Sequence, residues 1–286
     1  MTARELRGAP VAAAICEALA PRVDALKGRG VEPRLAIVRV GEEPGDLAYE
    51  RGARSRMGKV GIACDVSALP GDVSQDELEA VLTSLAGDPA THGILLLRPL
   101  APGLDERSAI ACVGAAKDVD GMTPASLAAT FTGAGEGYAP CTAEAVVRLL
   151  EHYEVQLDGA RAVVLGRSLV VGRPLAQLLL ARGATVTLCH SHTRDLASEC
   201  RRGEVLVSCM GRAGAVGASM VSAGSIVVDV GTNDDGAGGI TGDVDYASVS
   251  GVAAGVTPVP RGVGSVTTSV LAAHVVEAAE RLSSGR

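Results

Sequence analysis

The sequence predicts an α/β protein with two domains, and three observations support this fold class. The chain has 286 residues, and a length of this size favours about two domains. Short runs rich in Val, Ile and Leu alternate with helical patterns along most of the chain, as in parallel sheets whose strands are connected by helices. Hydrophobic residues make up 47% of the chain, which is enough for a sizeable core.

Helix and strand patterns alternate through the first half of the chain. Helices are expected at residues 10–30, 43–62 and 74–88, and β-rich runs at 33–41, 62–70 and 92–100. Ser74, followed three residues later by Glu77, forms a capping-box signature at the start of the third helix. The last β-rich run, "HGILLLRPL", is continuously apolar, so we expect a strand that is buried on both faces.

The second half predicts another parallel sheet. A turn-rich segment over 117–140 precedes a helix over 141–155, for which Thr142 is the expected N-cap. Strands are expected at 161–166, 184–190, 204–211 and 224–231, and a flexible loop at 234–239. The final helix, over 265–282, is long enough to return to the first domain, which would place hinges near 120–142 and 255–265.

Composition and charge exclude several classes of function. The net charge is −7 and aromatic residues make up only 2%, so the basic face and stacking rings of a nucleic-acid-binding protein are missing. No apolar run reaches the ~18 residues of a membrane span, and the first ten residues lack the apolar core of a signal peptide. We therefore expect a cytoplasmic protein that binds neither membrane nor nucleic acid. The seven cysteines contain no C-x-x-C pair, so we expect buried thiols without disulfides or a metal site.

The most informative stretch runs from a β-rich segment through a glycine-containing turn into a helix. The turn "GRSLVVG" spans Gly166 to Gly172, and it would present backbone N–H groups and a helix N-terminus to a phosphate. The usual G-x-G-x-x-G spacing is absent. A tight strand-to-helix turn that needs glycine only for its backbone is therefore an equally good interpretation of these two residues.

The end of the next strand favours NADP over NAD. NAD-binding proteins place an acidic residue there to bind the ribose 2′-OH, but this strand ends in "HSHT" and no carboxylate appears before Asp195. Ser191, together with Arg167 and Arg173 near the turn, is suited to a 2′-phosphate instead. The alternative is that both arginines are ordinary surface groups, either solvated or ion-paired.

Several loop motifs are ambiguous alone and specific together. In order they are "KDVDG", "PCT", "GRSLVVGRP", "TVTLCHSHT", "DVGTN", "GDVDY" and "TPVPRGVG". With them the chain resembles the bifunctional methylenetetrahydrofolate dehydrogenase/cyclohydrolase family over residues 7–282, nearly its whole length. The resemblance implies hydride transfer from methylenetetrahydrofolate to NADP, and then opening of the methenyl product by water to formyltetrahydrofolate.

The resemblance also implies the domain organisation and the partners. Residues 1–141 and 263–286 would form an N-terminal catalytic domain, and residues 142–262 a Rossmann-type NADP-binding domain, with a folate cleft between the two lobes. The C-terminal helix would return to the first lobe. A tetrahydrofolate derivative would be the substrate, NADP the cofactor, and the protein a homodimer.

Site residues carry over from the family position by position. The implied cofactor-binding residues are Gly166, Arg167, Ser168, Gly172, Ser191 and Thr232. The implied substrate-binding residues are Tyr49, Asp120, Pro260 and Gly264. Tyr49, which would position the folate, and Asp120, which would bind the pterin ring, are also the implied catalytic residues. Without the family context, Tyr49 reads simply as a partly buried ring in a helix.

The chain departs from the family pattern at the catalytic helix and in two loops. The family motif is Tyr-x-x-x-Lys, but Ala53 stands four residues after Tyr49, on the same helical face. Leu97 stands where the family has Gln inside "GIL-x-Q-x-PLP", and no spacing argument lets the neighbouring Arg98 replace the lysine. In the late loop, Arg261 replaces Gly and Ser265 replaces Pro.

These departures predict weak or absent cyclohydrolase activity. Attack by water on the methenyl carbon needs a group that exchanges or polarises a proton, which Ala53 and Leu97 cannot do. Hydride transfer needs mainly alignment of two carbon atoms, since the cofactor carries the chemistry. Two alternatives stay open: a specialised relative that acts on a modified folate or another one-carbon donor, and a binding protein that kept the fold without turnover.

Overall fold

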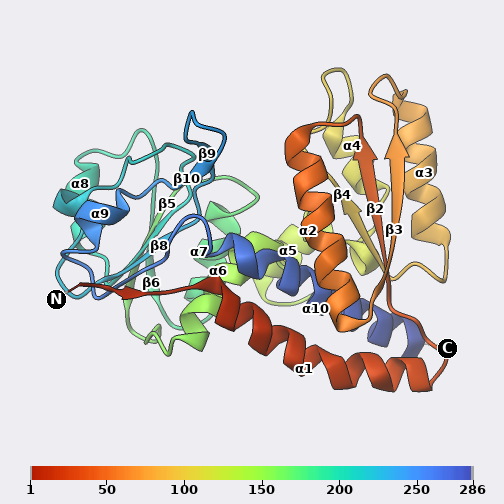
Figure 1. The fold of residues 1–286 in the computed structure, drawn as a ribbon, viewed down its shortest axis with the longest axis horizontal. Helices are drawn as coiled ribbons and strands as arrows, with labels where there is room; N and C mark the ends of the chain where they lie inside the picture. The colour runs from red at the N-terminus through yellow and green to blue at the C-terminus, as the bar shows by residue number, and fades with distance from the viewer. Residues whose placement is uncertain (1, 285–286) are drawn as a thin grey trace. The chain divides into compact units, whose positions relative to one another are not determined.

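The computed structural model describes residues 2–284, which divide into two compact units (Figure 1). Among the described residues, one comprises 2–13 and 142–267, and the other 14–141 and 268–284. We call them the six-stranded unit and the three-stranded unit after their main sheets. The divisions fall inside α1 (Gly8–Gly28) and α10 (Gly264–Ser284). The domain bounds expected from the family stay a prediction.

The three-stranded unit is built on a parallel sheet. Its strands are β2 (Arg34–Val40), β3 (Ala63–Leu69) and β4 (Gly93–Leu96), in the order β3-β2-β4. The three β-rich runs expected in the first half therefore form strands, and all four residues of β4 are buried, as its apolar sequence predicts. The sheet ends at Leu96, so Leu97 and Arg98 lie just past the carboxyl end of its edge strand.

Helices connect these strands or follow the last of them. They are α2 (Pro44–Val60), α3 (Gln75–Gly87), α4 (Glu106–Ala111) and α5 (Pro124–Thr132), with a short 3₁₀ turn at Ala115–Lys117. The capping box is confirmed, because the Ser74 hydroxyl accepts from the Glu77 N–H and the Glu77 carboxylate accepts from the Ser74 N–H. Helix α2 ends at Val60 and is followed by Gly61, whose φ of 77° favours glycine.

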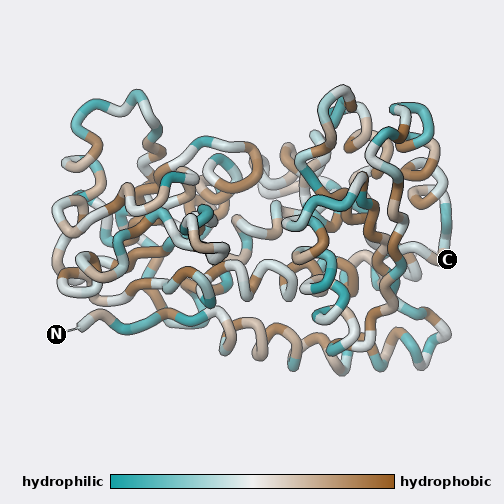
Figure 2. The backbone as a smooth tube through the Cα atoms, turned by 45° about the horizontal axis from the view of Figure 1, so that its top comes forward, coloured by the Kyte–Doolittle hydropathy of each residue, from teal (hydrophilic) through white to brown (hydrophobic). Residues whose placement is uncertain are grey.

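A compact apolar cluster fixes one face of this sheet. Alternate residues of β2 and β4 point to the same side, where helices α3 and α4 cover them. The cluster contains Ala36, Val38, Val40, Val73, Leu78, Leu82, Ile94, Leu96, Ala109 and Val113. Figure 2 shows hydrophobic stretches running through the interior and hydrophilic stretches in the outer loops. The ends of β4 and α4 are thereby held firmly, and both carry residues of the site described below.

The six-stranded unit has the second parallel sheet that the sequence predicts. Its strands are β1 (Arg4–Glu5), β5 (Arg161–Leu165), β6 (Thr185–Cys189), β7 (Val205–Ser208), β8 (Ile226–Asp229) and β11 (Gly255–Val256). The order is β1-β11-β8-β7-β5-β6, and every pair is parallel. Strands β1 and β11 have no strand signal in the sequence, because each has only two residues.

The remaining elements of this unit surround the sheet. They are α6 (Cys141–His152), α7 (Gly172–Leu180), α8 (Leu196–Arg201), a 3₁₀ turn at Ala218–Met220, α9 (Tyr246–Val249) and the hairpin β9 (Asn233–Asp234) and β10 (Ile240–Thr241). The expected loop over 234–239 connects the two hairpin strands. Helix α6 begins at Cys141, so Thr142 lies inside its first turn. The prediction that Thr142 is the N-cap is therefore wrong. Within residues 2–284 no helix is long and apolar enough to cross a membrane.

Candidate active site

The turn between β5 and α7 has the close backbone packing of a nucleotide-binding turn. Gly166 has a φ of 131°, and a Cβ atom there would lie 2.5 Å from the carbonyl oxygen of Cys209. A Cβ atom on Gly172 would run into the carbonyl oxygen of Gly166. Both positions therefore require glycine, and the backbone of the turn folds closely onto itself before the helix starts.

The start of α7 offers N–H groups to a ligand. Val171 precedes the helix, and its apolar side chain supplies no cap for these donors. The Ser168 hydroxyl accepts a hydrogen bond from the Val171 N–H at 3.1 Å, which closes the turn, and Ser168 itself is exposed. A helix N-terminus with uncapped donors favours a negatively charged group. The residues of this turn therefore fit the diphosphate of a dinucleotide.

The side chains expected around a 2′-phosphate are exposed and unpaired. Arg167, Arg173 and Ser191 are all exposed to solvent. Neither arginine forms an ion pair with any residue in the described part of the chain. Of the two surface states considered above, the ion-paired one is therefore excluded, and both guanidinium groups are available to an anion.

A buried aspartate that the sequence analysis did not single out shapes the loop that carries Thr232. Asp229, at the end of β8, accepts hydrogen bonds from the N–H groups of Gly231 at 2.9 Å, Asp243 at 3.0 Å and Val244 at 2.9 Å. Burial raises the pKa of the Asp229 carboxyl to about 6, although these donors oppose the rise. Thr232 follows in this loop and is exposed.

Asp243 organises the neighbouring loop after β7. Its fully buried carboxylate accepts hydrogen bonds from the Ser208 hydroxyl, from the Asn233 side chain and from three backbone N–H groups, at Met210, Gly211 and Arg212. The buried carboxylates of Asp229 and Asp243 therefore join the "DVGTN" and "GDVDY" loops by hydrogen bonds. Composition alone could not separate these aspartates from ordinary turn residues, because both occur beside glycine in polar loops.

The last loop of the six-stranded unit carries Pro260 and Gly264. Both are exposed, and Gly264 begins α10. Arg261 lies between them with a φ of 84°, in the left-handed region that favours glycine. The family pattern has glycine at that position. The arginine here adopts a backbone conformation that its Cβ atom disfavours.

In the three-stranded unit, the "KDVDG" turn is held by its first two polar residues. The ammonium of Lys117 donates to the carbonyl oxygens of Leu85 at 3.2 Å and Asp88 at 2.6 Å, at the end of α3. The buried carboxylate of Asp118 accepts from the N–H groups of Met122 at 3.0 Å and Thr123 at 2.6 Å. These residues are structural, and they leave Asp120 as the motif's side chain that faces the site.

Asp120 forms an ion pair that the sequence did not predict. The Arg98 guanidinium lies 3.2 Å from Asp120 Oδ2 and 3.1 Å from Glu106 Oε1. The Arg98 and Asp120 side chains are only 14% and 23% exposed, whereas that of Glu106 is 37% exposed. Burial raises the pKa of Asp120 to about 6, an effect that Arg98 opposes and Asp118 reinforces.

Tyr49, on α2, belongs to the same group of side chains. It is half-buried, and the burial raises the pKa of its hydroxyl well above the usual value. The charge on Asp120 adds to this shift, and that on Arg98 opposes it, so both act on the Tyr49 hydroxyl. The structure therefore places Tyr49 and Asp120 in one group of side chains, and Arg98 belongs to it through its ion pair with Asp120.

The two positions expected for the family's lysine and glutamine are apolar and closed. Ala53 is completely buried and Leu97 is 5% exposed. Helix α2 buries one face, made by Glu50, Ala53, Met57 and Val60. The alanine is therefore packed against the protein, and no solvent-accessible space remains at its Cβ atom.

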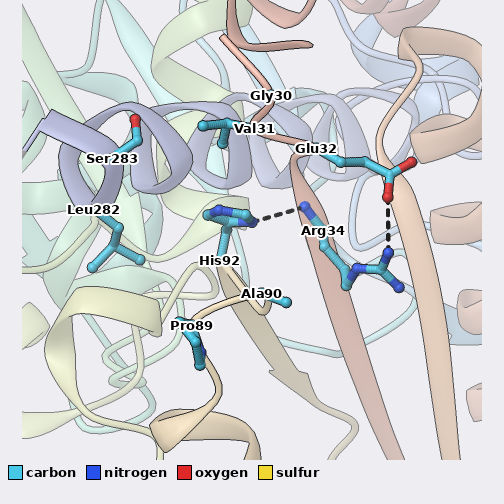
Figure 3. Close-up of a pocket in the computed structure, with 9 residues that line it drawn as sticks. All are labelled: Gly30, Val31, Glu32, Arg34, Pro89, Ala90, His92, Leu282 and Ser283. Carbon is cyan, nitrogen blue, oxygen red and sulfur yellow. Dashed lines mark hydrogen bonds and ion pairs between the residues drawn. The ribbon is translucent and has the colours of Figure 1, made fainter. Parts of the chain in front are cut away.

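A cavity elsewhere in the three-stranded unit contains none of these residues. It has a volume of about 340 Å³ and is lined by Gly30, Val31, Glu32, Arg34, Pro89, Ala90, His92, Leu282 and Ser283 (Figure 3). Arg34 forms ion pairs with Glu32 at 2.8 Å and with Asp65 at 2.5 Å. The His92 ring accepts a hydrogen bond from the backbone N–H of Arg34. Within the described chain, no group of His, Cys, Asp and Glu side chains suits a metal ion.

The parallel sheet, its glycine turn and the uncapped helix start define an NAD(P)-binding enzyme with a Rossmann-type domain. Comparison with known families agrees. The NAD(P)-binding domain of tetrahydrofolate dehydrogenase/cyclohydrolase matches residues 140–283, and the catalytic domain of the same family matches residues 6–120. The chain belongs to the tetrahydrofolate dehydrogenase/cyclohydrolase family, and it is an NAD(P)-dependent oxidoreductase of folate one-carbon metabolism.

Individual relatives match over almost the whole chain. The bifunctional protein FolD of Alkaliphilus oremlandii is 47% identical over 273 residues, which cover 96% of each protein. The solved FolD dehydrogenase/cyclohydrolase of Campylobacter jejuni superposes with a TM-score of 0.94 at 36% identity, covering 96% of this chain and 98% of that one. A Trypanosoma brucei relative complexed with NADP and an inhibitor gives 0.93 at 33% identity, covering 98% of both chains.

These matches confirm the resemblance, the fold class and the NAD(P) cofactor. The roles of individual residues stay predictions, including the assignment of Ala53 and Leu97 to the lysine and glutamine positions.

Proposed function

We propose that this protein oxidises methylenetetrahydrofolate with NADP to methenyltetrahydrofolate, and that its cyclohydrolase step is weak or lost. The observation that carries the proposal is the closed, apolar state of Ala53 and Leu97 beside a site that otherwise keeps Tyr49 and Asp120. The chain thus retains the groups for binding the ring and lacks the groups for moving a proton.

Hydride transfer is supported by the nucleotide turn and by what that reaction requires. NADP supplies the hydride acceptor when it is bound, and the protein's task is to align it with the folate carbon and to exclude water. In our proposal Gly166, Ser168 and Gly172 hold the diphosphate, and Tyr49 and Asp120 hold the folate ring. Oxidation of the methylene group leaves a methenyl cation, so no protein group has to donate or accept a proton in that step.

The cofactor preference rests on side chains at the end of β6. Arg167, Arg173 and Ser191 are exposed, both arginines lack an ion pair in the described chain, and no carboxylate stands between β6 and Asp195. These features favour a nucleotide with a 2′-phosphate. We therefore propose NADP as the physiological cofactor, with Thr232 as a further contact.

Water attack on the methenyl carbon is the step that the site supports poorly. Water must lose a proton as it adds, and the ring must open with proton transfer to nitrogen. Arg98 is the cation that lies in the site, but a guanidinium stays protonated at any physiological pH, and this one is fixed by two carboxylates. It cannot take over the proton exchange of a lysine.

The remaining parts of the proposal come from family membership. Pro260 and Gly264 would line the substrate site, a tetrahydrofolate derivative would be the substrate, and the protein would form a homodimer, which sedimentation of the purified chain measures. The cytoplasmic location expected from the sequence stays a prediction.

A direct test supplies methenyltetrahydrofolate without NADP. The loss of the methenyl compound is followed with and without enzyme, so that its spontaneous hydrolysis is subtracted. The proposal expects an enzymatic rate at least ~10²-fold below the dehydrogenase rate, the size of the contribution of one positioned acid–base group. Equal rates for the two steps would contradict it.

A further inference from the structure

The carboxylate of Asp120 is bound on one side only. Arg98 occupies Oδ2 at 3.2 Å, and no other residue within 2–284 forms a hydrogen bond or ion pair with this carboxylate. Oδ1 therefore keeps its acceptor capacity, and the Asp120 side chain is 23% exposed. A ring N–H donor can reach Asp120 without displacing Arg98.

Arg98 is itself fixed from two directions. Glu106 begins α4, where the Asp105 side chain caps the helix by accepting from the N–H groups of Arg107 and Ser108. Glu106 holds one terminal nitrogen of the guanidinium at 3.1 Å, and Asp120 holds the other at 3.2 Å. A rigid planar fork between two carboxylates sets the orientation of both. Releasing it would leave the largely buried carboxylate of Asp120 without a partner, so we expect this contact to stay closed.

We propose that Arg98 is a positioning residue, which keeps the Asp120 carboxylate ionised and directs its free oxygen toward the N–H donors of the substrate ring, with Glu106 as its anchor. This inference rests on the proposed function in one respect, the contact between Asp120 and the folate ring. The charge and geometry of Asp120 do not depend on which ring is bound.

The surroundings of Asp120 make Arg98 the decisive charge. Asp118 lies close enough to raise the pKa of Asp120, and the buried His274 on α10 lowers it when protonated. Tyr49 faces Asp120 from α2, and its raised pKa keeps it neutral. Arg98 is the only permanent positive charge among these groups, and it comes directly after burial among the causes that shift the pKa.

The test titrates Asp120 with and without this charge. Protein labelled with ¹³C at Asp carboxyls is titrated by NMR, and the Asp120 signal is assigned by its absence from Asp120→Asn. We expect its midpoint near pH 6 in the wild type and about one unit or more higher in Arg98→Met, as for loss of a close opposite charge. An unchanged midpoint in Arg98→Met would overturn the inference, whatever the substrate is.

Binding of tetrahydrofolate provides the second readout, by calorimetry between pH 5.5 and 8.5 (roughly one and a half log units on either side of neutrality). Arg98→Met should bind about 10-fold more weakly near pH 6 and recover at the alkaline end, because Asp120 ionises there without help. A loss that is the same at every pH would mean a merely structural role and would overturn the inference. Arg107→Met, which replaces an exposed arginine next to Glu106 on α4, is the matched control and should change nothing.

Two further variants keep the test decisive. Arg98→Lys retains the charge and should restore most of the Asp120 midpoint, even if Arg98→Met folds poorly. Glu106→Gln leaves Arg98 in place with one anchor fewer, and it should weaken tetrahydrofolate binding without raising the midpoint. A wild type that shows the expected titration but does not bind tetrahydrofolate would contradict the proposed substrate and leave the role of Arg98 supported.

Discussion

Ala53 lies one helical turn after Tyr49 on α2, and its side chain is completely buried. The two residues therefore differ in more than chemistry, because Tyr49 is half-buried beside charged groups whereas Ala53 is closed off from solvent. A lysine at position 53 would need space that this packing does not leave. The position that we assign to the family's lysine is thus closed by packing as well as apolar in composition.

Restoring both polar groups should restore hydrolysis. Ala53→Lys alone places an ammonium at a completely buried position, and we expect it to destabilise the protein by several kcal/mol, because a buried charge without a partner is costly. Ala53→Lys with Leu97→Gln restores both polar residues of the family pattern. We expect the double variant to hydrolyse methenyltetrahydrofolate at least ~10-fold faster than the wild type, as part of the ~10²–10⁴-fold that acid–base groups contribute.

The matched control for this experiment is Ser55→Lys. Ser55 is exposed on the same helix, so its replacement adds the same charge outside the site and should leave hydrolysis unchanged. A well-folded double variant with no gain in hydrolysis would show that the missing lysine and glutamine are not a sufficient explanation.

Removing the unpaired arginines should change the cofactor preference. Arg167→Met with Arg173→Met is expected to weaken NADP binding by about 10–100-fold, the loss of one or two charge-assisted hydrogen bonds, and to leave NAD binding nearly unchanged. Dissociation constants for both nucleotides, measured by fluorescence titration, decide this. Arg202→Met, an exposed arginine elsewhere in the six-stranded unit, serves as the control. Equal losses for NADP and NAD would place the arginines away from the 2′-phosphate.

The raised pKa of Asp229 predicts a pH-dependent stability. The folded-state pKa of about 6 lies above the ~3.9 of an exposed aspartate, so the folded state binds a proton more tightly. This contribution is fully present below pH ~4 and is lost as the pH rises through about 6. The stability advantage of the wild type over Asp229→Asn should therefore shrink from pH 4 to pH 7, by on the order of 2 kcal/mol.

Urea unfolding at a series of pH values measures this difference. Asp229→Asn should be less stable throughout, because its amide nitrogen cannot accept from both sides of the loop. The change with pH is the informative quantity. A difference between the two proteins that stays constant from pH 4 to pH 7 would mean that Asp229 titrates at its ordinary pKa.

Glycine at position 261 should stabilise the protein. Arg261 has a φ of 84°, which costs a residue with a Cβ atom about 1–2 kcal/mol, and glycine adopts this conformation freely. After the entropy that glycine adds to the unfolded chain, we expect Arg261→Gly to raise the free energy of unfolding by about 0.5–1 kcal/mol. Arg202→Gly, at a φ of −78°, should instead destabilise. A loss of stability in Arg261→Gly would show that the arginine makes compensating contacts.

The sequence predicted most of the architecture because the strands are apolar and the motifs are in order. Both sheets, the capping box at Ser74 and the long final helix follow from periodicity and local signals. Strands β1 and β11 were missed because two residues carry no periodicity. They exist because each pairs with a neighbouring strand, which is a tertiary effect.

The site was predictable at the level of motifs but not of partners. The family resemblance implies that Tyr49 and Asp120 both bind substrate, and in the structure the charge on Asp120 acts on the Tyr49 hydroxyl. The pairing of Arg98 with Asp120 and Glu106 joins residues that are 22 and 8 positions apart along the chain. No local pattern encodes such a contact. It depends on where β4 ends and where α4 begins, which only the folded sheet and its helices decide.

The most direct measurement of the central claim is a stopped assay with pure protein, methylenetetrahydrofolate and NADP. NADPH, methenyltetrahydrofolate and formyltetrahydrofolate are quantified separately at each time, against a blank for spontaneous hydrolysis. The account predicts that NADPH and methenyltetrahydrofolate accumulate in equal amounts. Formyltetrahydrofolate matching NADPH from the earliest times would contradict it, because the site would then hydrolyse its product without the lysine and glutamine.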